Sequence, residues 1–328
     1  MPDTGPQWLV ERGIGEDRAV LLDGDTLLAA KLRWPGDLTA GKVVKARLAA
    51  KPAGLRRGIA RLDDGTEILL APVPDGYSEG AEILVQIKRD VVAERGRLKR
   101  AQGRVVENGR NGGTQADRQP DVFETGRTVR AFPRGLWEEV FLWAWSGEIT
   151  FGGGALMFSP TPAMTVIDID GDLDPETLAR RAVEPIARSL DLLDIGGQVG
   201  IDFPTLEHRT TRQAIDEALT DALRHRKIER TAMNGFGFVQ LVSRLEGPSL
   251  LHRVAMHPCS AAARMALRKA EMVEGAGVTL LTVHPAVKAR LRPEWVTELE
   301  RRTGRPARIE PDANLALEAC AAQIVSHE

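Results

Sequence analysis

The chain has 328 residues, of which 43% are hydrophobic and 27% charged, and its formal net charge is −2. This composition is typical of a folded globular protein and excludes disorder along the whole chain. A nearly neutral chain cannot bind nucleic acid through bulk charge alone, but its net charge does not exclude a local basic patch. The length predicts about two domains, with small additions.

The sequence predicts a cytoplasmic protein without a membrane span. No apolar run approaches the ~20 residues that cross a bilayer, and residues 1–10 lack the pattern of a signal peptide. Cys259 and Cys320 are far apart and form no C-x-x-C pattern. We therefore expect neither a disulfide framework nor a cysteine-built zinc site, as in a reducing compartment.

The first part of the chain carries the pattern of short strands. Residues 7–34 predict strands around a turn at Asp23-Gly24-Asp25. Further β-like segments, separated by Gly, Pro and Asp turn signals, occupy residues 42–49, 57–62, 67–70 and 82–88. Short strands at this density predict a small barrel, with an OB-like fold as the candidate.

Residues 94–135 are basic. Between Arg95 and Arg134, ten Arg or Lys residues stand against four acids, and Asn108–Gly113 is rich in Asn and Gly. Such a stretch is either a solvated linker or a strap that binds phosphates, and its composition leaves both interpretations open.

From residue 136 onward, helical patterns alternate with strands. Trp137, Phe141 and Trp145 have helical spacing and predict a helix with a buried aromatic stripe. Extended segments are expected over residues 163–170, 198–203, 228–241, 277–283 and 307–310. Helices are expected over residues 175–192, 211–225, 261–274 and 293–303. This alternation predicts α/β layering from about residue 150.

Carboxylates end two of these strands. Asp168 and Asp170 close the first apolar strand and point to the same side of it, because side chains alternate along a strand. Asp202 ends the next strand after an intervening helix, and a strand–helix–strand unit makes parallel neighbours. We therefore expect the three carboxylates at one edge of the sheet, where open α/β sheets bind ligands.

Carboxylates crowded in this way need a cation or protons between them. Oxygen ligands favour Mg²⁺ or Mn²⁺ over Zn²⁺, and an ion held by aspartates is suited to phosphodiester hydrolysis. The alternative is that these acids are only polar residues at strand ends. The segment from Asn234 to Leu241 is similar to an RNA-binding RNP1 motif, but it fails at both ends and lacks the required strand order.

Longer segments of the sequence resemble the ribonuclease E/G family. The most specific are Gly153–Asp170 and the IARSLDLLDIGGQVGIDF run within Pro185–Phe203. Phe236-Gly237 and the Pro-Ser-Leu before Leu251 also fall where the family has such residues. Weaker similarity covers Trp8–Leu32, Gly41–Arg89 and Gly277–Pro311.

This resemblance implies an α+β protein in five parts. Residues 1–40 would form the N-terminal strands of a reduced ribonuclease-H-like scaffold, with 94–149 as a basic linker and the remainder of that scaffold. Residues 41–93 would form an inserted OB-fold RNA-binding domain. Residues 150–256 would form a deoxyribonuclease-I-like catalytic subdomain, and 257–328 a small C-terminal α/β domain.

The resemblance further implies Mg²⁺-dependent cleavage of single-stranded RNA, in which a metal-activated water attacks the phosphate. Asp168 and Asp202 match the family's metal-binding aspartates. Asp170 stands where the family usually has Asn, and it would orient the metal or a water. Binding without catalysis, and another metal-dependent phosphoesterase on the same scaffold, are the alternatives.

The chain departs from the family in several places. Nothing long enough matches the family's 5′-end sensor, which implies a shortened member in which residues 96–134 replace it. His257-Pro258-Cys259-Ser260 stands in place of the zinc-linking CPxC pattern, so zinc is not expected and any oligomer would lack a zinc link. Gly235 replaces an Arg of the family. The segment 41–104 contains one aromatic residue, Tyr77, so its RNA binding would rely on charge.

The basic residues expected to bind RNA lie in the barrel, in the basic stretch and at the start of the helix after Asp202. They are Lys42, Lys45, Arg47, Arg56, Arg57, Arg97, Lys99, Arg100, Arg104, Arg209 and Arg212.

Overall fold

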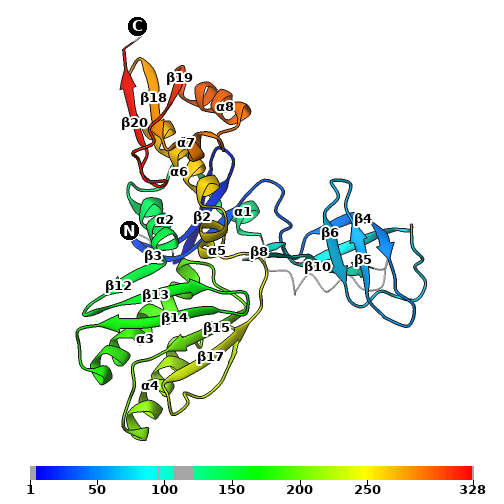
Figure 1. The fold of residues 1–328 in the computed structure, drawn as a ribbon, viewed down its shortest axis with the longest axis vertical. Coiled ribbons are helices and arrows are strands. Elements are labelled where there is room, and N and C mark those ends of the chain that lie inside the picture. The colour runs from blue at the N-terminus through cyan, green and yellow to red at the C-terminus, as the bar shows by residue number, and fades with distance from the viewer. Residues whose placement is uncertain (1–4, 95, 107–120, 327–328) are drawn as a thin grey trace.

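The computed structural model describes residues 5–94, 96–106 and 121–326. Within them the chain forms four sheets and one closed barrel, with the barrel projecting from the side of the molecule (Figure 1). A six-stranded sheet and a three-stranded sheet lie toward opposite ends of the molecule, and a four-stranded sheet lies between them (Figure 1). This mixed α/β architecture agrees with the fold class expected from the sequence.

The N-terminal strands form the central four-stranded sheet in the order β11-β1-β2-β3. The strands are β1 (Gln7–Arg12), β2 (Asp17–Asp23), β3 (Thr26–Arg33) and β11 (Arg127–Val129). Two helices of the same region are α1 (Val122–Thr125) and α2 (Leu136–Ser146). As expected, α2 carries Trp137 and stacks Phe141 on Trp145, with ring centroids 5.6 Å apart. Asn108–Gly113 falls outside the described residues.

The barrel closes in the order β10-β6-β5-β4-β7, which confirms the OB-like barrel expected from the sequence. Its strands are β4 (Val43–Ala50), β5 (Gly58–Arg61), β6 (Glu67–Leu70), β7 (Glu82–Arg89) and β10 (Ala101–Val106). Strand β10 corrects the expected end of the barrel at residue 93, because it lies in the stretch 94–149 that was expected to hold a basic linker and the remainder of the scaffold. It pairs parallel with β6 and antiparallel with β7, and so supplies the fifth strand.

A short hairpin connects the barrel strands β7 and β10. It consists of β8 (Val92–Glu94) and β9 (Arg97–Lys99), which pair antiparallel. Arg97 and Lys99 both donate to the carbonyl oxygen of Pro162, at 3.4 and 3.3 Å. The hairpin therefore contacts residue 162, in the loop between two neighbouring strands of the six-stranded sheet.

The six-stranded sheet has the order β12-β13-β14-β15-β17-β16. Its strands are β12 (Glu148–Phe151), β13 (Gly154–Pro160), β14 (Thr165–Gly171), β15 (Gln198–Asp202), β16 (Ile228–Arg230) and β17 (Phe238–Ser243). Helices α3 (Pro175–Leu192) and α4 (Arg209–Ala222) lie on one face of it (Figure 1). The segment expected to be extended over 228–241 is two antiparallel strands joined by a turn.

The C-terminal part holds a three-stranded sheet in the order β19-β18-β20. The strands are β18 (Val278–Val283), β19 (Ala307–Pro311) and β20 (Ala321–Val325). The helices are α5 (Leu250–Met256), α6 (Pro258–Met272), α7 (Pro285–Lys288) and α8 (Pro293–Thr303). Helix α5 and strand β20 were not expected from the sequence. Within the described ranges, no helix combines the length and apolar character needed to cross a membrane.

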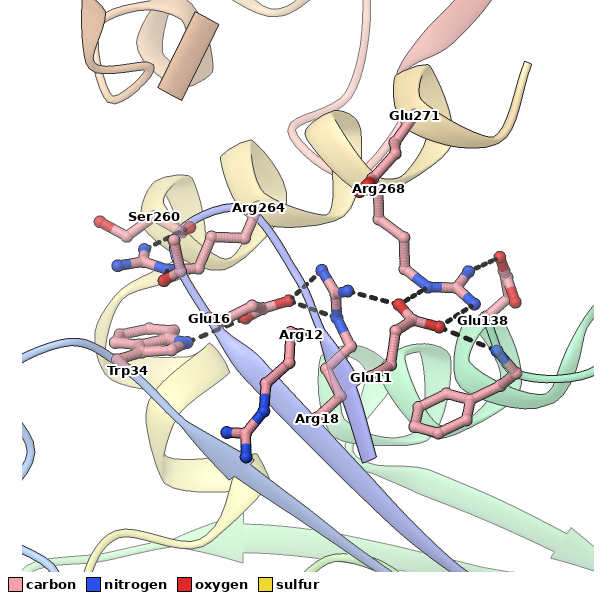
Figure 2. A network of polar contacts seen from close by, with 12 residues as sticks. Glu11, Arg12, Glu16, Arg18, Trp34, Glu138, Ser260, Arg264, Arg268 and Glu271 are labelled. Atoms are coloured by element: carbon pink, nitrogen blue, oxygen red, sulfur yellow. Dashed lines mark hydrogen bonds and ion pairs between the residues drawn. The ribbon is translucent and has the colours of Figure 1, made fainter. Parts of the chain in front are cut away.

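A buried network of charges ties three of these parts together (Figure 2). Arg18 Nη1 of β2 donates to Glu11 Oε1 of β1 at 2.6 Å, and Arg268 Nε of α6 donates to the same oxygen at 2.9 Å. Arg268 also pairs with Glu138 of α2. Both guanidinium groups are almost completely buried. Because a buried charge is costly unless it is paired, this network fixes α2 and α6 against the N-terminal sheet.

Stacked arginine and tryptophan side chains extend this connection toward the barrel. The Trp34 ring, just after β3, lies 4.1 Å from the Arg264 guanidinium and 5.4 Å from that of Arg253. Arg264 also lies over Trp295 of α8, at 4.7 Å. Arg253 Nη2 of α5 pairs with Asp37 at 2.7 Å, on the connection that enters the barrel. These contacts hold the entry to the barrel against α5 and α6.

Replacing the central carboxylate of the network tests this account. Glu11→Gln should lower the free energy of unfolding at pH 7 by about 3 kcal/mol, because Arg18 and Arg268 stay charged and lose their shared partner. Burial raises the pKa of Glu11, but the Arg268 hydrogen bond and the two positive charges outweigh it and lower that pKa below its usual value. The network therefore stabilises the fold above the pKa of the unfolded chain and loses this effect as pH falls through the folded pKa.

Urea denaturation across this pH range measures the effect. The difference in unfolding free energy between wild type and Glu11→Gln should shrink in acid, where wild-type Glu11 is also protonated. Glu82→Gln is the matched control, because that side chain is 86% exposed in β7. Equal stabilities at pH 7, or a difference that persists in strong acid, would contradict the assigned role.

Candidate active site

The two strands that end in aspartates lie side by side. Strands β14 and β15 pair in parallel, and their register sets Asp168 directly opposite Asp202. Both side chains are exposed, whereas Ile167 and Ile201 beside them are buried. The parallel pairing and the shared edge expected from the sequence are confirmed.

Helix α3 produces this pairing. It starts at Asp174, whose side chain accepts from the amide of Thr177 at 3.0 Å, and Pro175 occupies its first turn. Its apolar side, which includes Ile186 and Leu190, is buried against the sheet and β3. An amphipathic helix of this length carries the chain back across the sheet, so β15 begins at the same end as β14.

Asp170 lies two residues beyond Asp168 on the same exposed side of β14. Its position pairs with Ala155 of β13, and it lies past the last residue of β15 that pairs with β14. Among the described residues, no group of three or more His, Cys, Asp or Glu side chains is arranged to hold a metal ion. The geometry is therefore a register pair, Asp168 and Asp202, with Asp170 farther along the edge.

The main chain orients two of these carboxylates. Asp168 Oδ1 accepts from the amide of Ile169 at 3.0 Å, and Asp170 Oδ1 accepts from the amide of Gly171 at 2.9 Å. Each bond fixes one oxygen against the strand that carries it. The first turns of α3 and α4, which follow β14 and β15 in the chain, contact each other, since Thr211 Oγ1 donates to Glu176 Oε2 at 3.4 Å.

An aromatic ring lies on the same open face of the sheet. Phe238 is the register partner of Asp202 on β17. A Cβ atom at Gly200 would come within 2.6 Å of Phe238 Cζ and 2.9 Å of Met164 Sδ. Since only glycine leaves room there, the Phe238 ring lies across β15 and makes an apolar floor next to the aspartates.

The basic residues expected to bind RNA fall into two groups. Five are exposed on the barrel, at the start of β4, along it and in the loop after it: Lys42, Lys45, Arg47, Arg56 and Arg57. Arg209 is exposed in the first turn of α4. The RNA-binding role of these six residues stays a prediction.

The other five predicted basic residues have protein partners, and in the first group Arg47 Nη2 lies 3.9 Å from Glu82 Oε1. Arg97 and Lys99 pair with the buried carboxylate of Glu94, whose pKa they hold below its usual value although burial raises it. Arg100 Nε contacts Glu67 Oε2 at 2.8 Å, and Arg104 Nε donates to Gln86 Oε1 at 2.8 Å. Arg212 donates to the carbonyl oxygens of Leu206 and Glu207. These five side chains shape the hairpin, the barrel and the loop after Asp202.

Sequence reasoning treated residues 234–241 as an RNP1-like run and matched Phe236-Gly237 to the family, but it did not place the turn between β16 and β17 beside Asp202. Gly237 has φ of +87°, and its carbonyl oxygen accepts from the amide of Phe203, the residue after Asp202. The Asn-Gly-Phe-Gly run was the available signal, since such residues between two extended segments indicate a turn.

When no cation is present, repulsion between Asp168 and Asp202 should lower the free energy of unfolding. In EDTA, Asp168→Asn or Asp202→Asn should raise the free energy of unfolding by about 0.5 kcal/mol, because each removes a repulsion between facing like charges. Urea denaturation measures this change, with Asp221→Asn, exposed at the far end of α4, as the control. A loss of stability in either variant would show that the two carboxylates do not repel each other.

Comparison with known proteins bears on this part of the chain. Residues 146–244 match the sequence model of the Ribonuclease E/G family. Over 109 residues, 30% of this chain, the identity is 30% to "Ribonuclease E" of Haemophilus influenzae and 29% to "Ribonuclease E" of Escherichia coli. It is 32% over 118 residues, 33% of this chain, to "Ribonuclease E" of Buchnera aphidicola.

These matches span only 12%, 10% and 12% of the length of the three relatives. The family match includes β14, α3, β15 and β17, and with them the register-paired aspartates. Over this segment, the chain is similar to the ribonuclease E/G family.

Proposed function

We propose that this chain is a divalent-metal-dependent endoribonuclease that cleaves single-stranded RNA. The observation that carries the proposal is the parallel register that sets Asp168 opposite Asp202 at an exposed sheet edge. The similarity of this segment to the ribonuclease E/G family, and to relatives named Ribonuclease E, supports RNA as the substrate.

The residues present fit a magnesium ion. Asp168 and Asp202 offer hard oxygen donors on adjacent strands, and both side chains are exposed. Mg²⁺ in nucleotide-processing sites commonly uses one or two carboxylates and completes its shell with waters and substrate phosphate oxygens. A register pair therefore suits it, and Mn²⁺ prefers the same ligands. Zinc is not part of the proposal, since it favours a closed set of Cys and His ligands.

Such an ion would supply the positive charge and acidity that phosphodiester hydrolysis needs. In this proposal Asp168 and Asp202 bind it, and Asp170, two residues farther along the edge, orients it or the attacking water. The N-terminus of α4, which begins seven residues after Asp202, adds positive potential where a phosphate would lie.

The remaining parts receive roles in the same proposal. The six-stranded sheet with α3 and α4 is the deoxyribonuclease-I-like catalytic subdomain, and the four-stranded sheet is a reduced ribonuclease-H-like scaffold. The barrel brings RNA to the site through exposed lysines and arginines such as Lys45 and Arg57. The setting is RNA processing or decay in the cytoplasm.

Two other functions agree with the same observations. A relative that binds RNA without cutting it would share the fold, and another metal-dependent phosphoesterase would share the site. The first is disfavoured because a binding protein has no need of two facing like charges, which cost stability. The second differs from the proposal in substrate, and so is separated from it by substrate choice.

Incubation of the full chain with labelled single-stranded RNA tests the proposal. We expect cleavage with Mg²⁺ and none with EDTA. Asp168→Asn and Asp202→Asn should each lower the rate by at least about a hundredfold, because each removes a charged ligand at the reacting phosphate. Asp221→Asn, on the same domain, should cleave as the wild type does.

The outcomes separate the three functions. RNA that is bound but uncut with Mg²⁺ or Mn²⁺ would establish the binding protein instead. Cleavage of a small phosphodiester with intact RNA left unchanged would establish the other phosphoesterase. Equal cleavage by wild type and both aspartate variants would remove the site from the reaction.

A further inference from the structure

The turn between β16 and β17 presents an aromatic ring to solvent. Phe236 is 85% exposed, the highest value among the exposed large hydrophobic side chains of the described residues. Gly235 beside it has open space where a side chain would lie. A ring so exposed stabilises no core, because burial is what makes an apolar side chain favourable to folding.

The turn nevertheless holds Phe236 in a defined position. Asn234 Oδ1 accepts from the amides of Phe236 and Phe238, at 2.9 and 3.0 Å. The amide of Asn234 donates to Phe238 O at 3.1 Å, and that of Gly237 donates to Asn234 O at 3.2 Å. The main chain on both sides of Phe236 is therefore tied down, so little backbone conformational entropy is left to lose on binding a ligand.

The turn is also anchored at the candidate active site. The amide of Phe203 donates to Gly237 O at 3.3 Å, and Phe203 directly follows Asp202. A Cβ atom at position 237 would lie 2.8 Å from Phe203 O, so only glycine permits this approach. Phe236 is thus one residue from a main-chain contact with the strand end that carries Asp202.

We propose that Phe236 is a stacking platform for one nucleobase of the RNA strand, next to the phosphate that is cut. This inference rests on the proposed function and adds a contact that sets how the strand lies on the site. Bases of a single strand expose flat π-faces, and aromatic side chains bind them by stacking with little regard to base identity.

The surroundings of the ring favour a nucleobase over a protein partner. Phe236 follows two exposed residues without apolar side chains, Asn234 and Gly235, and its turn contacts the strand end that carries Asp202. Protein interfaces centre on clustered apolar anchors shielded from water. An exposed ring on a turn held beside the aspartates instead suits a base whose phosphate lies at the aspartates.

Binding of RNA with a single missing base tests this contact separately from cleavage. The probes are one single-stranded RNA and a set of copies, each with an abasic residue at a different position around the cleavage site. Affinities are measured in EDTA at one salt concentration, because RNA binding depends strongly on salt. Wild type should lose about tenfold in affinity at one position, in line with the stacking of one base.

The variants decide whether Phe236 makes that contact. Phe236→Ala should bind the intact RNA about tenfold more weakly and show no further loss with the abasic copy. Phe236→Trp should restore the affinity, whereas Phe236→Leu should restore little of it, since a nonaromatic side chain lacks a π-face. Leu142→Ala, an exposed apolar side chain of α2 at 56% exposure, is the matched control and should match wild type.

Several results would overturn the inference. One is an equal loss of affinity for the abasic RNA in wild type and Phe236→Ala. The others are no position at which a missing base lowers the affinity, and full affinity for the intact RNA in Phe236→Leu. If any of these results is obtained and the intact RNA is still cleaved in Mg²⁺, the stacking role of Phe236 is wrong and the proposed function is retained. Wild type that fails to bind RNA would remove both.

Discussion

Strands β14 and β15 run parallel because α3 carries the chain back across the sheet between them. The alternation of buried and exposed residues along each strand then fixes which side chains face outward, since a shift by one residue would turn every side chain over. With Ile167 and Ile201 in the core, Asp168 and Asp202 must face out beside each other. The core of the sheet thus determines the geometry of the candidate site.

The same logic extends to the elements around the site. The register between β15 and β17 places Phe238 beside Asp202, and Gly200 leaves room for the Phe238 ring to lie over β15. The buried Glu11–Arg18–Arg268 network and the contacts of Trp34 with Arg253 and Arg264 hold the other parts of the chain in place. In the proposed function, such contacts would keep the barrel and the aspartates at a fixed separation.

Local patterns in the sequence account for much of this architecture. Helix α3 was predicted at residues 175–192, where it is observed, from the alternation of strands with amphipathic helices. In the structure Asp174 caps it and Pro175 is its first residue. The pairing of Asp168 with Asp202 also followed from strand–helix–strand order. These features depend on residues close together in the chain, or on one general rule of topology.

Features that depend on distant residues could not be predicted in this way. Strand β10 closes the barrel through partners on β6 and β7, and a Cβ atom at its Gly103 would lie 2.4 Å from Val85 Cγ1. Glu11 and Arg268 meet across 257 positions of sequence. The partners of Arg97 and Lys99 on Glu94 likewise became visible only in the folded chain.

The central claim is that the register-paired aspartates bind a divalent ion, and Mn²⁺ titration followed by electron paramagnetic resonance tests it most directly. Wild type without RNA should show a site that Asp168→Asn and Asp202→Asn each weaken by at least about tenfold, the effect of losing one charged ligand. Asp221→Asn should bind as the wild type does. Unchanged Mn²⁺ affinity in both aspartate variants would contradict the account.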